Sequence, residues 1–458
     1  MTDHAAVMAD LRPPDDASMR VFRRLLLNTL ASGVTSTFLW FALTFWVYLE
    51  TRSVVATGVI AGAFSMSSAV LSPFFGTFVD RHRKREAMVL ATATATLCFI
   101  GATVVFLSVD ADRLLRLTNP FFWLLVALTL LGSVAGQLRG ISLSTCVTLL
   151  VPEDRRDRAN GLIGTVTGVS FAITSVFSGL TIGQLGMGWA YGMATVLTAA
   201  TLVHLLTITI DEPAPAPDAT ADGRRQHLDL RSAVDAIRAT PGLMMLILFA
   251  ACNNLLGGVF MALMDAYGLS LVSVETWGFI SMAFIAGGVV VARFGLGPSP
   301  LRIVLLANLV NWVICSVFAL RSSIVFLTIG MLVWLALIPV IEAGEQTVLQ
   351  RSIPLDRQGR VFGFAQLVEN AASPLTAVLM APLAEVVFMP FMTDGRGVGW
   401  IGGWFGAGPA RGLALMFTIA GLIGVVVSGA FRVSPSYRML AAKLQRVTTE
   451  PGGAGAAG

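Results

Sequence analysis

The sequence predicts an all-α protein that crosses a membrane twelve times, in two pseudo-symmetric halves of six helices each. The chain of 458 residues is 55% hydrophobic and 13% charged, whereas a soluble domain carries about 25% charged residues. Apolar stretches long enough to span a bilayer recur from Leu25 to Phe431. One short basic motif also occurs twice, which indicates that the two halves are related.

The repeated motif reads VPEDRRDRANG at Val151–Gly161 and IPLDRQGRVFG at Ile353–Gly363. The copies are offset by 202 residues without a gap, and five of the eleven positions are identical. Pro, Asp and Arg are ordinary loop residues, so chance similarity is the alternative. Each copy ends one apolar segment and begins another, and we call the copies the first hinge and the second hinge.

Twelve apolar segments are expected to span the bilayer. They are Leu25–Leu49, Val54–Phe78, Ala87–Ser108, Pro120–Leu150, Ala159–Gly183, Trp189–Ile210, Pro241–Tyr267, Val274–Arg293, Arg302–Leu320, Ser322–Gln350, Val361–Phe388 and Arg411–Phe431. The chain then divides into an N-terminal segment at 1–24, a first half at 25–210, a linker at 211–240, a second half at 241–432 and a tail at 433–458.

Three connecting segments carry further expectations. The linker opens with a Pro- and Ala-rich run and continues as HLDLRSAVDAIRAT, which predicts a short amphipathic helix on the inner membrane face. The outer loop Met389–Pro409 is expected to lie on the outer membrane surface. The glycine-rich end of the tail is expected to be disordered.

The distribution of Lys and Arg orients the spans. With both termini inside, the inner segments hold 24 of these residues and the outer segments hold 6. This positive-inside bias predicts a multi-pass protein of the cell membrane with cytoplasmic termini. The N-terminal segment lacks the pattern of a cleaved signal peptide, so the first span is expected to be retained.

Metal, cofactor and enzyme chemistry are not expected. The four cysteines stand alone in apolar runs and the four histidines are scattered, so neither residue type forms a metal-ligand pattern. No nucleotide-binding loop or nucleophile arrangement is present. We therefore expect no cofactor and no nucleic-acid partner. We also expect the protein to be a monomer in the lipid bilayer.

The loop after the second span resembles a known family motif. It reads GTFVDRHRKRE at Gly76–Glu86 and is similar to the pattern G-x-x-x-D-R-x-G-R-[RK] of the major facilitator superfamily. The second glycine of the pattern is Arg83 in this chain. The matching residues are Gly76, Asp80, Arg81, Lys84 and Arg85. The resemblance implies the major facilitator fold and alternating access.

Further segments resemble the macrolide-efflux-type branch of drug exporters. They are Thr51-Arg52-Ser53, both hinges, Gln366, Glu369, Pro374, Pro382, Pro390 and Ala410-Arg411-Gly412. Such exporters often carry an aspartate early in the first span, whereas Gly33–Ser36 has none. We therefore expect no proton-carrying acid in the first half.

The resemblance places Asp80 beside the start of the eleventh span. There its carboxylate would meet a positive helix end and either Arg357 or Arg360, which would hold the inner side closed. Asp154 and Asp356 stand where helix N-caps are expected. The candidates for this conformational latch are Gly76, Asp80, Arg81, Lys84, Arg85, Asp356, Arg357 and Arg360. The first hinge, which lacks an Asp80-like partner, is expected to tolerate substitution better than the second.

Acidic residues inside spans are functional candidates, because charge is costly in a membrane. Glu342 and Glu345 share one helix face at i and i+3, and Glu369 lies in the eleventh span. Burial and mutual repulsion favour the protonated form, so these three are proton-coupling candidates. The alternative is a buried glutamate that bonds a neighbouring helix.

Other polar or aromatic residues of the spans are candidates for lining a central cavity. They are Arg139, Asn253, Asn254, Gln137, Asn370 and Trp40. Arg139 is a possible partner for Glu342 or Glu345, and the asparagines are alternatively interhelical hydrogen-bond partners.

These features predict a secondary transporter that exports drug-like or amphipathic small molecules against proton entry. The alternatives are a dedicated metabolite or lipid exporter, an importer of the same fold, and a membrane sensor or scaffold without transport. The substrate and the coupling ion do not follow from the sequence.

Overall fold

The computed structural model describes residues 16–51, 54–110, 114, 118–212, 230–269, 283–371, 376, 379–380 and 382–449. Within these ranges the chain is helical almost throughout and contains no strand. Several expectations fall outside the described residues: those for the polar run of the linker, the beginning of the eighth span, the glycine-rich end of the tail, and Arg52, Ser53 and Pro374.

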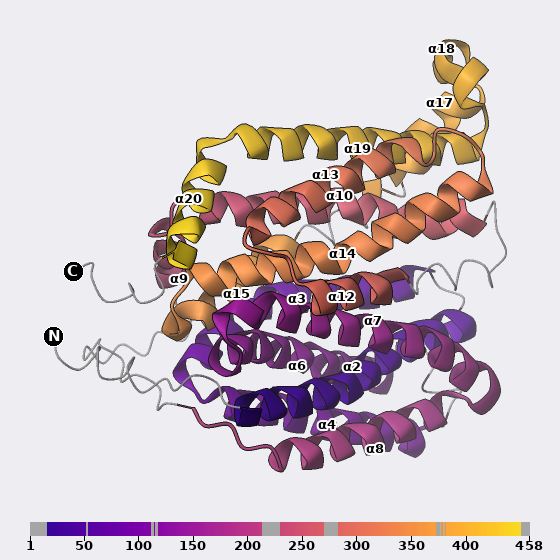
Figure 1. Cartoon of the computed structure of the whole chain (residues 1–458). Helices are drawn as coiled ribbons and strands as arrows, with labels where there is room; N and C mark the ends of the chain where they lie inside the picture. The colour runs from indigo at the N-terminus through magenta and orange to yellow at the C-terminus, as the bar shows by residue number, and fades with distance from the viewer. Residues whose placement is uncertain are drawn as a thin grey trace.

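In the part of the chain that the structure describes, twelve of the helices run side by side in one bundle (Figure 1). Those of the first half are α2 (Asp16–Thr51), α3 (Val54–Arg81), α4 (Lys84–Ser108), α6 (Pro120–Leu150), α7 (Arg156–Leu180) and α8 (Met187–Leu206). Those of the second half are α10 (Leu243–Leu269), α12 (Ala283–Phe294), α13 (Pro300–Val317), α14 (Ile324–Ser352), α15 (Gln358–Asn370) and α19 (Pro409–Val433). The predicted fold class is confirmed.

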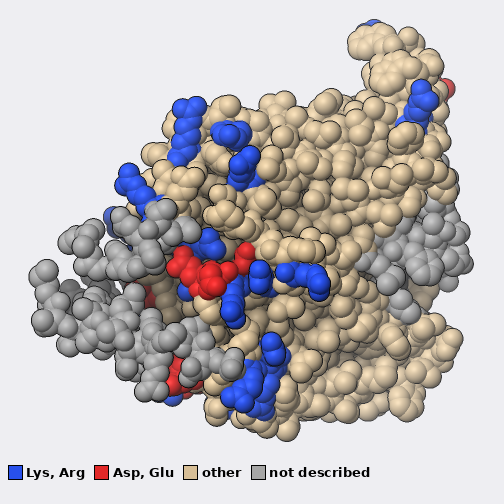
Figure 2. All heavy atoms as spheres, viewed as in Figure 1, with Lys and Arg blue, Asp and Glu red and all other residues tan. Residues whose placement is uncertain are grey.

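The surface of the bundle is that of a membrane protein. Within the described ranges, nine helices are long and apolar enough to cross a bilayer. Large apolar side chains project outward from them, with Leu97 69%, Val203 63% and Val426 69% exposed. On the face shown in Figure 2, charged atoms gather mainly at one end, and the flanks of the bundle carry few. Lipid would cover such flanks.

Two short helices lie at the charged end of the bundle (Figure 1). Helix α9 (Leu230–Arg238) is the amphipathic helix expected in the linker, but its apolar face is buried against protein, where Ala236 and Ile237 join a core. Helix α20 (Pro435–Thr449) was not expected from the sequence. It buries Leu440 and Leu444 in the same core. We call this end, which also carries both hinges, the hinge end.

The opposite end carries the long loop before α19, from Met389 to Gly408. This loop is largely helical, with α17 (Met389–Thr393) and α18 (Arg396–Phe405) projecting beyond the bundle (Figure 1). Trp400 and Trp404 on α18 are 75% and 64% exposed. Exposed tryptophans one turn apart suit a membrane–water interface, as expected for this loop.

The two hinges have the same backbone, residue for residue. Helices α6 and α14 end 202 positions apart, as do the short 3-10 turns Glu153–Arg155 and Leu355–Arg357 that follow. The residues before these turns, Pro152 and Pro354, have φ of −54° and −58° and the same ψ of 148°. The internal repeat is therefore structural.

The N-cap expectation for the hinge aspartates is wrong. Asp154 and Asp356 lie inside the 3-10 turns, and neither α7 nor α15 has a side-chain cap. Each instead lies within 3.8 Å of the arginine that follows it, on the surface. The extra turn moves the start of the helix past the aspartate.

The halves meet along two seams. Helix α3 packs along α15, and α7 packs along α12 and α14. The glycine shared by the hinges lies at each seam: a Cβ on Gly161 would lie 2.5 Å from the Ala292 nitrogen, and one on Gly363 would lie 2.3 Å from the Ser72 oxygen. Only glycine permits such close approach of two helices.

Replacing Gly76 with alanine is expected to weaken the α3–α15 seam. A Cβ there would lie 2.2 Å from the Gly359 oxygen, and relieving such an overlap costs about 1–3 kcal/mol. The thermal midpoint of the purified protein should fall. Gly62→Ala on the same helix is the control, because its Cβ meets nothing within 4 Å. Equal midpoints for both variants would contradict the close-packed seam.

Candidate functional site

Three acidic side chains lie near the middle of the second half. Glu342 lies ten residues before the end of α14, which is about 15 Å along the helix. Glu369 lies eleven residues after the start of α15, or about 16 Å. Since the hydrocarbon core is about 30 Å thick, both acids stand near mid-depth.

The acids form one cluster. Glu345 and Glu369 lie close enough for their carboxyl groups to interact, and Glu342 interacts electrostatically with Glu345. Two carboxylates this close repel each other, which favours a proton on one of them. Glu342 is exposed, whereas Glu345 and Glu369 are half-buried. The cluster therefore places two interacting carboxyl groups beside an exposed one.

An apolar layer separates this cluster from the hinge end. Val79 of α3 and Ile141 of α6 join Val361 and Phe362 of α15 in one core, and all four are at most 2% exposed. Val361 and Phe362 lie about two turns from Glu369 toward the hinge end. Since this layer draws on both halves, it closes the path between them at that end.

Arg139 lies away from the acidic cluster. Its guanidinium donates to Asn28, Thr29 and Thr92, on α2 and α4, and the residue is 4% exposed. The Asn28 amide in turn bonds the Thr201 carbonyl. The expected pairing with Glu342 or Glu345 is thus absent among the described contacts, because neutral oxygens of the first half surround the guanidinium.

Of the other cavity candidates, two contact neighbouring helices and three are exposed or half-buried. The Asn253 side chain accepts a hydrogen bond from the indole of Trp312 on α13, so it joins two helices. Trp40 stacks on Phe64 of α3, with ring centroids 4.6 Å apart. Asn254 is exposed, and Gln137 and Asn370 are half-buried.

The Asp80 carboxylate spans the α3–α15 seam at the hinge end. One oxygen accepts from the Gly359 amide at 2.6 Å. The other accepts from the Arg360 amide at 3.0 Å and from its Nε at 2.8 Å. Arg360 also donates to Ser232 of α9 at 2.9 Å, which connects the linker to this contact. A carboxylate at a helix N-terminus and beside an arginine is doubly favoured.

The remaining latch candidates do not share this contact. Gly76 allows α3 to approach Gly359. Lys84 donates to the Val79 carbonyl, and Arg85 donates to carbonyls at the end of α8. Arg81 is half-buried at the end of α3. Asp356 and Arg357 face the surface beside each other, so of the two arginines expected to meet Asp80 it is Arg360 that does.

Asp157 at the other seam was not singled out from the sequence. It is 5% exposed, and one carboxylate oxygen accepts from the Leu296 amide at 2.6 Å. The other accepts from the Arg158 amide at 2.7 Å. The partner of Asp157 is a backbone amide, which every residue except proline has. The sequence around Leu296 therefore does not predict the contact.

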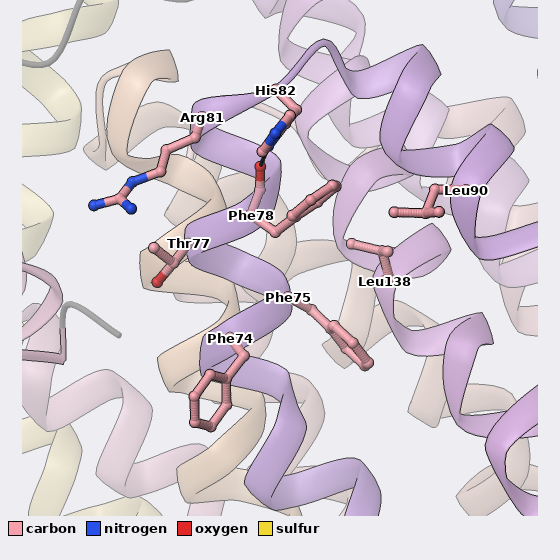
Figure 3. Close-up of a pocket in the computed structure, with 8 residues that line it drawn as sticks. All are labelled: Phe74, Phe75, Thr77, Phe78, Arg81, His82, Leu90 and Leu138. Carbon is pink, nitrogen blue, oxygen red and sulfur yellow. Dashed lines mark hydrogen bonds between the residues drawn. The ribbon is translucent and has the colours of Figure 1, made fainter. Parts of the chain in front are cut away.

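A groove of about 370 Å³ lies beside α3 near the hinge end (Figure 3). Phe75 and Phe78 of α3 face Leu90 and Leu138 across it, while Arg81 leaves α3 on another side. Phe75 and Phe78 lie about half a turn around α3 from the face that contacts α15. The groove is therefore separate from the acidic cluster.

Two six-helix halves joined at a closed end, with ionisable groups at mid-depth, define a polytopic membrane transporter. The sequence profile of the Major Facilitator Superfamily matches residues 25–377. The chain belongs to the Major Facilitator Superfamily.

Known relatives include exporters. The enterobactin exporter EntS of Shigella boydii serotype 18 is 23% identical over 380 residues, which cover 80% of this chain and 86% of EntS. EntS of Escherichia coli O81 has the same identity and coverage.

Solved structures share the fold. The human organic anion transporter MFSD10 has a TM-score of 0.66 at 15% identity, with 91% of this chain and all 100% of that chain covered. A bacterial homologue of the iron transporter ferroportin, in an outward-facing state, has a TM-score of 0.67 at 16% identity and covers 90% of this chain and 100% of its own.

Proposed function

We propose that this transporter exports drug-like or amphipathic small molecules in exchange for protons, by alternating access. It would act as a monomer in the cell membrane, with the hinge end and both termini in the cytoplasm. The excess of Lys and Arg in the segments at that end supports this orientation. The resemblance to macrolide-efflux-type exporters supports the substrate class.

The observation that carries the proposal is the pair of interacting carboxyl groups at mid-depth, Glu345 and Glu369. Because mutual repulsion favours one proton on such a pair, the pair can take up a proton from one side and release it to the other. Accessible Glu342 provides a route to the pair. A substrate that binds between the halves would compete with this proton, which is the linkage that exchange requires.

The Asp80 contact supplies the conformational part of the proposal. Its three hydrogen bonds exist only while α3 and α15 lie together at the hinge end. The contact therefore acts as a latch that favours the state closed toward the cytoplasm, and its loss would shift the population toward the inward-open state.

The proposal predicts proton-driven accumulation in proteoliposomes. With an imposed pH gradient, lipophilic dyes or macrolides should accumulate in vesicles that contain the protein, and a protonophore should abolish the accumulation. A strain without its own exporters should gain resistance to the same compounds. Accumulation that ignores the protonophore would overturn proton coupling. If no compound produces accumulation or proton flux, the alternative of a membrane sensor without transport is favoured.

A second candidate is a dedicated metabolite exporter. The similarity to EntS, described as an enterobactin exporter, favours it. Resistance to many unrelated compounds supports the drug exporter, whereas release of one metabolite into the medium without broad resistance supports the dedicated exporter.

A further inference from the structure

Each seam is joined by a contact between a carboxylate and a backbone amide, at equivalent positions of the two halves. The position that carries the carboxylate at one seam supplies the amide at the other. The hinge offset of 202 residues places Asp157 at the position of Gly359. Aligning the segment GTFVD at Gly76–Asp80 with ARFGL at Ala292–Leu296 places Leu296 at the position of Asp80. At the α3–α15 seam the end of α3 carries the carboxylate and the hinge helix supplies the amide. At the α7–α12 seam the hinge helix carries the carboxylate and the loop supplies the amide.

Two glycines fit the second contact. Gly295 has φ of +72°, a conformation that favours glycine, and a Cβ there would lie 2.6 Å from the Asp157 carboxylate. Gly297 in the same loop has φ of +70°, but its Cβ would meet nothing within 4 Å. The loop therefore needs glycine twice for its backbone, and once also to admit the carboxylate.

Neutral hydrogen bonds extend the second contact across the halves. The Asn160 amide, one turn from Asp157, donates to Thr347 at 2.9 Å and to Gln350 at 2.8 Å. Gln350 in turn donates to the Ser144 carbonyl of α6 at 3.0 Å. All of these bonds join the first half to α14, and all would break if the seam opened.

We infer that Asp157 is a second latch, which holds the α7–α12 seam closed through the Leu296 amide. Opening the hinge end then requires both carboxylates to release their partners. The two latches differ in strength. Asp80 loses all three of its bonds on opening, whereas Asp157 keeps its bond to Arg158 in its own helix. The inference rests on the proposed alternating access.

The test measures opening directly and needs no substrate. Spin labels at Glu86 on α4 and Arg438 on α20, both exposed, report the separation of the halves at the hinge end. Exposed Cys252 is first replaced by serine; the other three cysteines are buried. Asp157→Asn should raise the ratio of open to closed molecules about tenfold, since a hydrogen bond to a charged group is weakened. The double variant with Asp80→Asn should show the product of the single effects.

Matched controls separate a latch from a folding defect. Asp154→Asn changes an exposed aspartate of the same hinge and should leave the ratio unchanged. Gly295→Ala should reproduce the opening and Gly297→Ala should not, although both strain a similar backbone. If Asp157→Asn does not fold, the comparison of Gly295→Ala with Gly297→Ala tests the second latch instead. An unchanged ratio in Asp157→Asn and Gly295→Ala, with opening in Asp80→Asn, would overturn the second latch and leave the proposed function intact. If Asp80→Asn also fails to open, alternating access through this end is itself contradicted.

Discussion

Replacing Glu369 with glutamine is expected to remove proton-driven transport while substrate still binds. The carboxamide keeps the shape of the side chain but cannot exchange a proton, so Glu345 loses the carboxyl group with which it interacts. In proteoliposomes the imposed pH gradient should no longer drive accumulation. Exchange of labelled for unlabelled substrate, which needs no net proton movement, should persist.

The control for this prediction is Glu385→Gln. Glu385 is exposed near the end of the bundle opposite the hinges, and its replacement should leave the pH dependence unchanged. Glu345→Gln should reproduce the effect of Glu369→Gln, because either change removes one member of the pair. If Glu369→Gln transports with the pH dependence of the parent protein, the pair is structural and the coupling site lies elsewhere.

Replacing Asp80 with asparagine is expected to leave the hinge end open and transport impaired. The change removes the charge from three hydrogen bonds across the α3–α15 seam. Weakening bonds to a charged group by about 2 kcal/mol would shift the ratio of open to closed molecules about thirtyfold. The spin-label distances at the hinge end and the initial transport rate measure the two consequences.

Asp356→Asn is the matched control for Asp80. Asp356 belongs to the hinge that Asp80 contacts, but its side chain is 60% exposed and lies 3.7 Å from Arg357. It should transport normally. A normal rate and an unchanged distance distribution in Asp80→Asn would show that the contact does not control the conformation.

Much of the architecture was accessible from the sequence, because length and hydropathy define membrane helices. The hinge repeat also predicted a structural repeat, since identical residues in register took the same backbone. The meeting of Asp80 with the start of α15 followed from the family motif and from helix electrostatics. What the sequence did not specify is which arginine it would meet: the 3-10 turn directs Arg357 outward and Arg360 toward the seam.

The rotation of each helix about its axis was not predictable. A helix that is apolar on all sides carries no pattern that states which face meets protein and which meets lipid. Arg139 was therefore placed in the cavity, whereas the neutral oxygens of Asn28, Thr29 and Thr92 hold it in the first half. The small polar residues that surround it look like ordinary residues of a span.

Other misses had a usable signal. Tyr437, Leu440 and Leu444 recur at helical spacing behind Pro435, which is a helix-start residue, so α20 could be predicted. Asp157 had no such signal, because its partner at Leu296 is a backbone amide. With Asp157 inferred to be a latch, we expect the first hinge to tolerate substitution at Asp154 but not at Asp157.

The exchanged carboxylate has a consequence for how such a chain can be assembled. If two copies of the first half were paired, Asp80 of each copy would face Asp157 of the other, and two negative charges would meet at both seams. Two copies of the second half would bring amide to amide, with no acceptor. Each half is therefore complementary to the other and incompatible with itself. A gene split at the linker should therefore yield heterodimers of co-expressed halves and no homodimers.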